Sequence, residues 1–225
     1  MRVYIIFFLV FIFIGCRKDR DNNCSNDSFM DNNNVWYIAE YPDYCRNCIL
    51  PHKVILGKDT IINNNSYKSI LHYSGDSIES KISKPNIFGY VRETIDKKVY
   101  WFIGFNGSSP SDNLLFDFNA NINDTIISPD GAWIVTKIDS VIIKNKFKRR
   151  IALKSICNEP LKFWIEEIGD MSDLFNSPSC IFINGSEYFI SDNSYFKQTC
   201  FLKGSEIVYK DSSTTNCWNY KNVAY

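Results

Sequence analysis

Residues 137–153, KIDSVIIKNKFKRRIAL, decide the fold of this chain. An apolar run at 141–143 leads into a polar turn, and the returning segment places Phe147, Ile151 and Leu153 on one face. Alternation with a period of two is typical of a strand that buries one side. The stretch therefore predicts a β-hairpin with an apolar inner face.

The same pattern occurs in the first half of the chain. In both copies an aromatic residue follows an aspartate by eight positions: Tyr67 follows Asp59, and Phe147 follows Asp139. We expect an all-β fold with little helix, in which antiparallel hairpins form a sandwich or a curled, barrel-like sheet. Further hairpins are predicted at 54–73, 89–103, 180–190 and 196–209.

The N-terminus predicts export. Arg2 precedes an unbroken apolar run at 3–14, which as a helix would span roughly 18 Å, too short for a bilayer core of about 30 Å. We therefore expect a signal peptide over residues 1–15 rather than a transmembrane helix. Gly15-Cys16 resembles the end of a bacterial lipobox, although Phe13 stands where leucine is usual. The resemblance implies that Cys16 is lipidated; an ordinary secretory signal is the alternative.

Residues 16–34 are polar and rich in Asn and Asp, and they predict a flexible, lipid-anchored tether. A single β-rich domain is expected over residues 35–225. The chain carries 25 basic and 25 acidic side chains, a balance that gives no reason to expect nucleic acid as a partner. We expect a cell-envelope location, periplasmic or at the cell surface, with the membrane contacted through the N-terminal lipid.

The eight cysteines agree with export, because disulfides persist outside the cytoplasm. Cys45 and Cys48 have the spacing of a redox pair, but no helix pattern follows them to activate a thiol. A zinc site made of these two and His52 lacks a second pair of ligands at motif spacing. Structural disulfides, with Cys24 as one candidate partner, are the preferred interpretation.

The last hairpin predicts a disulfide between Cys200 and Cys217. A turn at 203–204 brings the chain back beside Cys200, and the polar loop 211–216 is long enough to fold Cys217 toward the same place. A disulfide requires its two Cα atoms to lie within about 7 Å, which a hairpin neighbour can meet. Pairing of Cys180 with either of these cysteines is the alternative.

Six short elements occur in a fixed order: Lys58-Asp59-Thr60 with Tyr67-Lys68, 89–94 with Lys98-Val99-Tyr100, 114–118, Asn123-Asp124-Thr125, Asp139-Ser140-Val141 and 164–169. Together they resemble a lipid-anchored β-module of Bacteroidetes lipoproteins. Lys58, Asn123 and Glu167 stand where that pattern has glycine. The resemblance implies an all-β module, periplasmic or at the surface, with no established activity.

Four sites have an aspartate followed by Thr or Ser and then an aliphatic residue. This resembles the O-glycosylation acceptor of exported Bacteroidetes proteins. Turn chemistry, with the aspartate ending a loop before a β-branched strand, is an equal alternative. The resemblance implies modification at Thr60, Ser77, Thr125 and Ser140.

The sequence assigns no catalytic, cofactor-binding or metal-binding residue. It has no nucleophile-elbow, zinc-protease or phosphate-loop motif. Of its two histidines, His72 is expected at a half-exposed strand position. Carboxylates at Glu93, Asp117 and Glu166 lie in apolar strands, where we expect turns, strand ends or Arg92 to hydrogen-bond them.

The aromatic side chains are expected mainly in the core, because each ring buries a large apolar area. An exposed aromatic face for a glycan or peptide is the alternative for the five tryptophans. The expected function is therefore that of a structural or ligand-binding β-module of the envelope. A secreted hydrolase acting on glycans is the alternative.

The anchor can be tested with Cys16→Ala. Because the acyl chains would be attached at this cysteine, we expect the variant to lose metabolic acyl labelling and to leave the membrane fraction. Detergent partitioning of the parent and variant chains is the measurement. Equal partitioning of the two would contradict the lipoprotein prediction.

Overall fold

Every regular element of the protein is a β-strand in the part that this computed structural model describes. That part comprises residues 28–42, 49–74, 85–103, 111–128, 131–156, 161–171, 180–183, 186–189, 195–214 and 217. The strands are β1 (Asn34–Tyr41), β2 (Leu50–Ile62), β3 (Asn65–Ser74), β4 (Asn86–Glu93), β5 (Lys98–Ile103), β6 (Ser111–Asp117), β7 (Thr125–Ser128), β8 (Gly131–Ile143), β9 (Lys146–Ser155), β10 (Lys162–Ile165), β11 (Gly169–Asp170), β12 (Cys180–Ile183), β13 (Ser186–Phe189), β14 (Tyr195–Lys203) and β15 (Glu206–Lys210).

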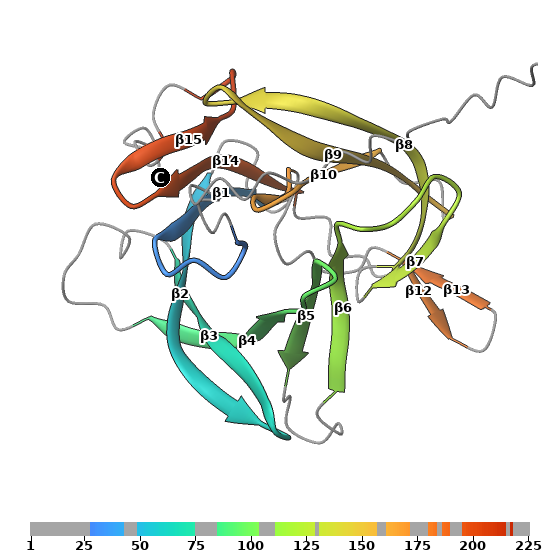
Figure 1. Cartoon of the computed structure of the whole chain (residues 1–225), viewed down its shortest axis with the longest axis horizontal. Helices are drawn as coiled ribbons and strands as arrows, with labels where there is room; N and C mark the ends of the chain where they lie inside the picture. Colours follow the sequence, from blue (N-terminus) through green and yellow to red (C-terminus); the bar gives the residue numbers. More distant parts are fainter. Residues whose placement is uncertain are drawn as a thin grey trace, which may run out of the picture.

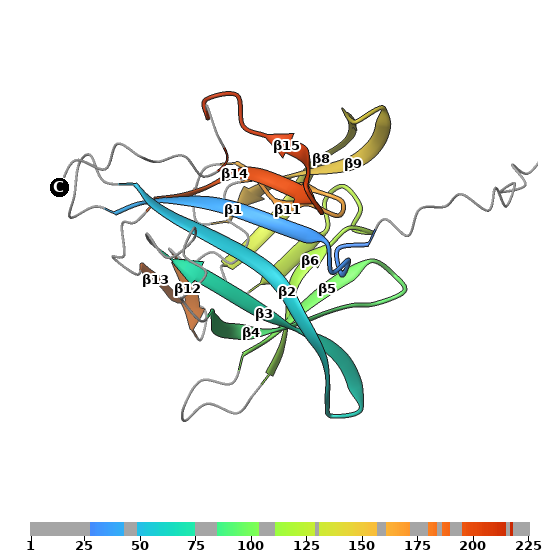
Figure 2. The ribbon, with the colours of Figure 1, turned by 90° about the vertical axis from the view of Figure 1, so that its left-hand side faces the viewer.

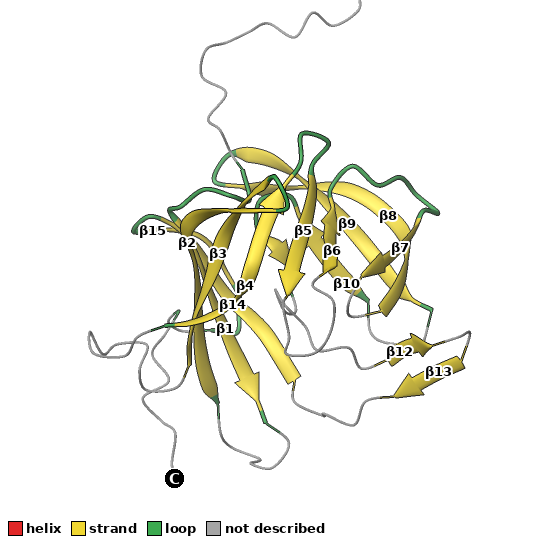
Figure 3. Cartoon of the chain, turned by 90° about the horizontal axis from the view of Figure 1, so that it is seen from below, coloured by secondary structure: helices red, strands yellow, loops and turns green. Residues whose placement is uncertain are grey.

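Two antiparallel sheets make up the fold. Eight strands lie in the order β15-β14-β1-β2-β3-β4-β5-β6, and five lie in the order β11-β10-β9-β8-β7. The larger sheet curls into a half-barrel, and the smaller sheet packs against its concave side (Figures 1 and 3). β12 and β13 pair as a separate hairpin. The predicted all-β fold of antiparallel hairpins is confirmed.

Both of the matching hairpins form, but their aromatic residues differ in burial. Their turns are Asn63-Asn64 and Lys144-Asn145, with positive φ at both positions, as a type I′ turn requires. Tyr67 is the third residue after its turn and is buried. Phe147 is the second residue after its own turn, so it lies at the hairpin tip, and 76% of it is exposed. The prediction that Phe147 is buried was wrong.

The packed domain includes residues that the sequence analysis assigned to the tether. Phe29 is fully buried among the core aromatics. Ser28 Oγ donates a hydrogen bond to Glu93, and Gly204 N donates to the Asn33 carbonyl at 2.7 Å. The domain boundary therefore lies at or before residue 28 rather than at 35.

An aromatic cluster joins the two sheets. Trp36 on β1 and Phe116 on β6 come from the larger sheet, and Trp164 on β10 comes from the smaller one. The Phe116 and Trp164 rings meet edge to face at 5.3 Å, and Phe29 contacts both Trp36 and Phe116. Burial of such rings is the largest single source of stability in a core of this kind.

One polar contact crosses the core. Trp36 Nε1 donates a hydrogen bond of 2.7 Å to the carbonyl of Ile168, in the turn between β10 and β11. Positive φ values at Glu167 and Gly169 shape that turn, and the Ile168 side chain is also buried. The indole thus holds the turn of one sheet against the inner face of the other.

Trp36→Phe should lower the free energy of unfolding by about 2–4 kcal/mol, because it leaves a cavity and removes the donor of a buried carbonyl. Trp133→Phe is the matched control. Trp133 is equally buried, but its Nε1 makes no hydrogen bond within the described residues. Urea unfolding should therefore show a loss smaller by about 1–2 kcal/mol for the control. Equal losses would mean that the hydrogen bond contributes nothing.

Candidate functional site

The two ends of the eight-stranded sheet are built differently. At the closed end, short turns at 63–64, 94–97 and 204–205 join neighbouring strands. At the open end β1, β3 and β5 finish and β2, β4, β6 and β14 begin (Figure 3), and the sequence between these strands is longer than at the closed end. Binding residues commonly lie where loops meet a rigid scaffold. The open end is therefore the candidate location of a site.

One carboxylate and two imidazoles form a hydrogen-bonded relay on the inner face at the open end. His52 Nε2 lies 2.8 Å from Glu40 Oε2, and His52 Nδ1 lies 3.0 Å from His72 Nε2. His52 is 8% exposed, and Glu40 and His72 are half-buried. These two are all the histidines of the sequence. We call Glu40, His52 and His72 the Glu-His-His relay.

The strand register brings the relay together. His52 lies opposite Ile38 on β1, and His72 lies opposite Val54 on β2. Ile38 and Val54 belong to the buried core, and directly opposed residues share a face of the sheet. Glu40 follows Ile38 by two positions and so points to the same side. Figure 2 shows β1, β2 and β3 side by side, the arrangement on which this register depends.

Aromatic rings extend the relay across five strands. The Phe196 ring lies 6.1 Å from that of His52, and the two imidazole rings have centroids 5.1 Å apart and planes 15° apart. Phe88 then contacts His72 at 5.6 Å and stacks on Trp101 at 5.4 Å. We call these five residues, from β14, β2, β3, β4 and β5, the ring row. Phe88 is 37% exposed, so the row reaches the surface there.

The backbone of β4 makes room for this row. The β3–β4 register shifts between Ile70 and Leu71, which places Phe88 at a bulge. Gly89 beside it has a φ of 149°, a region that other residues rarely adopt. A Cβ at this position would clash with the indole Nε1 of Trp101. Glycine at 89 therefore permits Trp101 to lie under Phe88.

A buried amide lies on the same face as the relay. Gln198 on β14 is opposite Ile38, which is itself opposite His52. The Gln198 side chain is fully buried, and neither its oxygen nor its nitrogen has a hydrogen-bond partner within the described chain. Buried amides are nearly always paired, so this end of the half-barrel has unused polar capacity.

Electrostatics distinguish the two histidines. Burial, together with the charge of a protonated His52, lowers the pKa of His72 from 6.5 to about 4. His72 is thus a neutral imidazole near pH 7. His52 lies between the Glu40 carboxylate and this neutral ring, with a nitrogen facing each. An imidazole oriented by a carboxylate is suited to moving a proton or to binding a polar ligand.

The carboxylates chosen from the sequence are occupied elsewhere. Lys97 Nζ lies 3.9 Å from Glu93 Oε1 and 3.7 Å from Glu166 Oε1, near the closed end. Asp117 accepts a hydrogen bond from the backbone N–H of Asn119. The expectation that these groups are paired with turns and strand ends fits the structure. Arg92, the expected alternative partner, instead pairs with Asp112.

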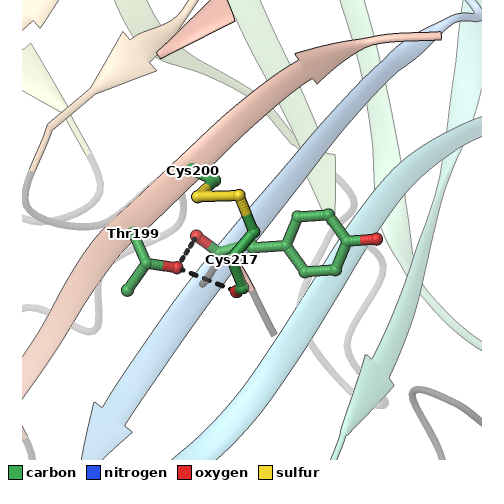
Figure 4. The surroundings of a disulfide bond; sticks show 4 residues. Thr199, Cys200 and Cys217 are labelled. Atoms are coloured by element: carbon green, nitrogen blue, oxygen red, sulfur yellow. Dashed lines mark hydrogen bonds between the residues drawn. A yellow bond between two sulfur atoms is a disulfide. The ribbon is translucent and has the colours of Figure 1, made fainter. Parts of the chain in front are cut away.

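The disulfide between Cys200 and Cys217 is present, as Figure 4 shows. The Cα atoms are 5.3 Å apart, and both cysteines are buried on the outer face of the larger sheet. Thr199 Oγ1 donates to the carbonyls of Tyr37 and Cys217, at 3.0 and 3.4 Å. The bridge thus fixes residue 217 against β14 and β1. Cys16, Cys24, Cys45, Cys48 and Cys157 lie outside the described residues.

The expected modification sites differ in exposure. Thr125 and Ser140 are exposed and Thr60 is half-buried, while Ser77 lies outside the described residues. The aspartates that precede them have structural partners: Asp59 pairs with Lys68, Asp139 with Arg150, and Asp124 accepts from the Asn121 N–H. Turn and cross-strand chemistry therefore accounts for the aspartates, while modification stays a prediction.

Within the described residues, no three His, Cys, Asp or Glu side chains are placed to hold a metal ion. Both nitrogens of His52, the one zinc candidate that is described, face Glu40 and His72. The described chain also has no helix long and apolar enough to cross a membrane. Four of the five tryptophans are buried, and Trp218 lies outside the described residues.

Sequence reasoning missed the Glu-His-His relay. It placed His72 on a strand at a half-exposed position, which is where it lies. It did not pair His72 with His52, because their meeting depends on the hairpin register of β2 and β3. The available signal was parity: His52, Val54 and Leu56 alternate on β2, as Ile70 and His72 do on β3.

The lowered pKa of His72 predicts a stability that depends on pH. Unfolded His72 binds a proton below about pH 6.5, and folded His72 only near pH 4, so the unfolded state gains protons first. The free energy of unfolding should fall by about 1–2 kcal/mol as the pH drops across this window, because solvent that reaches the half-buried ring screens part of the effect. Denaturant unfolding at about pH 7 and about pH 4 should show a smaller fall for His72→Gln than for the parent chain. Identical falls would contradict the prediction.

Comparison of the chain with family models, with curated proteins and with solved structures finds no match in any of the three. The function of the site must therefore be inferred from its own geometry.

Proposed function

We propose that the protein is a lipid-anchored envelope module that binds a glycan at the open end of its half-barrel. The observation that carries this proposal is the ring row, which surfaces at Phe88 beside the half-buried His72. Glu40 lies farther along the same face, beyond His52. Binding sites commonly combine apolar and aromatic walls with a few convergent polar groups. The open end has both within one face of the sheet.

A sugar fits this combination of groups. The C–H face of a pyranose packs on an aromatic ring, as the exposed part of Phe88 would allow. Sugar hydroxyls can then exchange hydrogen bonds with an imidazole or a carboxylate, which His72 and Glu40 supply. A peptide could also pack against these rings. A peptide has less need of the imidazole and carboxylate, which suit the many hydroxyls of a sugar.

Binding is better supported than glycan hydrolysis. Most glycosidases use two carboxylates that flank the scissile bond. The relay contributes a single carboxylate, Glu40, which is engaged with His52. Glu93 and Glu166 approach each other only through Lys97, near the closed end. The hydrolase alternative thus has no pair of acids at the open end within the described residues.

The proposed location rests on the N-terminal sequence, and the domain is arranged in a way that suits it. The chain enters the domain at the closed end, where Ser28 contacts Glu93 and Asp31 lies 3.4 Å from Lys203. A lipid at Cys16 would therefore hold the closed end toward the membrane and leave the open end pointing away. Asn123 and Glu167, where the resembling lipoprotein modules have glycine, both have positive φ, which supports the resemblance.

A glycan array probed with the parent chain and with Phe88→Ala tests the binding proposal. We expect the parent to bind at least one glycan and the variant to lose most of that signal, because the stacking surface is removed. Phe147→Ala is the matched control, since Phe147 is more exposed but lies at the tip of the β8–β9 hairpin. Equal binding by the parent and Phe88→Ala would place the ligand elsewhere, and no binding by the parent would refute a glycan-binding function.

A further inference from the structure

The protons of the Glu-His-His relay can be assigned from its hydrogen bonds. Ionised Glu40 only accepts, so His52 must donate to it from Nε2–H. When His52 is neutral, its Nδ1 has no hydrogen and can only accept. His72 Nε2, 3.0 Å away, must then carry a hydrogen and donate it. A neutral imidazole carries one N–H, so His72 Nδ1 has a free lone pair in this state.

Protonation of His52 reverses every one of these assignments at His72. The His52 cation carries hydrogens on both nitrogens and donates from Nδ1 to His72 Nε2. His72, still neutral, must then hold its own hydrogen on Nδ1. The same atom that accepted a hydrogen bond before now donates one, and no side chain has to rotate.

The proton count balances along the relay. One proton from solvent binds at His72 Nδ1, while the hydrogen on His72 Nε2 passes to His52 Nδ1. The pair begins with two hydrogens on its four nitrogens and ends with three, and the added charge lies on His52 beside the Glu40 carboxylate. His72 passes the proton without keeping it, which agrees with the low pKa that burial and the His52 charge give it.

His72 Nδ1 is placed to meet a ligand. Within the described residues it makes no hydrogen bond, and His72 is half-buried rather than sealed. Its neighbour in the ring row is Phe88, the exposed ring of the site. A hydroxylated ring stacked on Phe88 would lie next to His72, whose ring centroid is 5.6 Å from that of Phe88.

Among the described residues that face the two imidazoles, Glu40 carries the one charge. From β1 the Glu40 carboxylate faces His52, and from β4 the Phe88 ring faces His72. From β14 the facing groups are the Phe196 ring and, on the same face, the neutral Gln198 amide. The carboxylate stabilises a positive charge on His52, and the neutral neighbours do not compete for its proton.

We propose that His72 Nδ1 is the ligand-contacting atom of this site, and that the proton on His52 decides whether this atom accepts or donates the hydrogen bond. With His52 neutral the site takes a hydroxyl donor, such as a sugar O–H. With His52 protonated it selects an acceptor, such as a carbonyl or carboxylate oxygen. The identity of the ligand rests on the proposed function, whereas the reversal at His72 does not.

Nitrogen NMR of the two histidines tests the reversal without any ligand. The full chain, made without a histidine tag and held in detergent micelles, can be labelled with ¹⁵N-histidine, and only two imidazoles will give signals. His72→Gln assigns them. We expect His72 Nδ1 to move from the unprotonated to the protonated position, and Nε2 to move the opposite way, at the same pH at which His52 gains its second hydrogen.

Glu40→Gln, a variant of nearly the same shape, should shift this joint transition to lower pH, because the carboxylate no longer stabilises the His52 cation. Glu93→Gln is the matched control, since Glu93 lies at the closed end with Ser28 and Lys97. It should leave the transition in place. A single His72 tautomer throughout the titration, charging of His72 before His52, or an unchanged transition in Glu40→Gln would overturn the inference. A glycan array without binding would refute only the proposed function.

Discussion

The hydrogen bond from the Trp36 indole to the Ile168 carbonyl is the contact on which the rest of the structure depends. It joins strands that are far apart in the sequence and lie in different sheets. Around it, Phe29, Phe116 and Trp164 fill the space between the half-barrel and the smaller sheet. A curled sheet without such a filling would expose its concave face, so the smaller sheet and its aromatic contacts are what make the curl stable.

The inner face of the larger sheet is not apolar throughout, and its polar part forms the candidate site. Apolar side chains occupy the inner face where the two sheets meet. At the open end the same face carries Glu40, His52, His72 and Gln198 instead. Polar groups placed on an inner face cost stability unless they are hydrogen-bonded or ligand-bound. The side chains of the relay hydrogen-bond one another, whereas the Gln198 amide has no hydrogen-bond partner within the part of the chain that the structure describes.

The hairpins were predictable because their signals are local. Alternation over a few residues and a short polar turn identified both matching hairpins, and the loop after β15 was short enough to place Cys217 beside Cys200. Side-chain contacts between strands were not predictable in the same way, because they depend on strand register across turns and bulges. Phe147 shares its parity on β9 with the buried Ile151 and Leu153, but it lies at the tip of its hairpin and is exposed. The relay needed the registers of three strands at once, and no single stretch of sequence contains them.

The disulfide has a mechanical consequence. β1 begins at Asn34 and pairs along its length with β14, and Cys200 on β14 carries the bridge to Cys217. A force applied between residue 28 and residue 217 would therefore enter one of two neighbouring strands and leave through the other. Because Cys200 lies opposite Tyr37, near the start of β1, that load would act on the β1–β14 pair at the closed end. The strands β3, β4 and β5, which hold His72, Phe88 and Trp101, lie outside the loaded path.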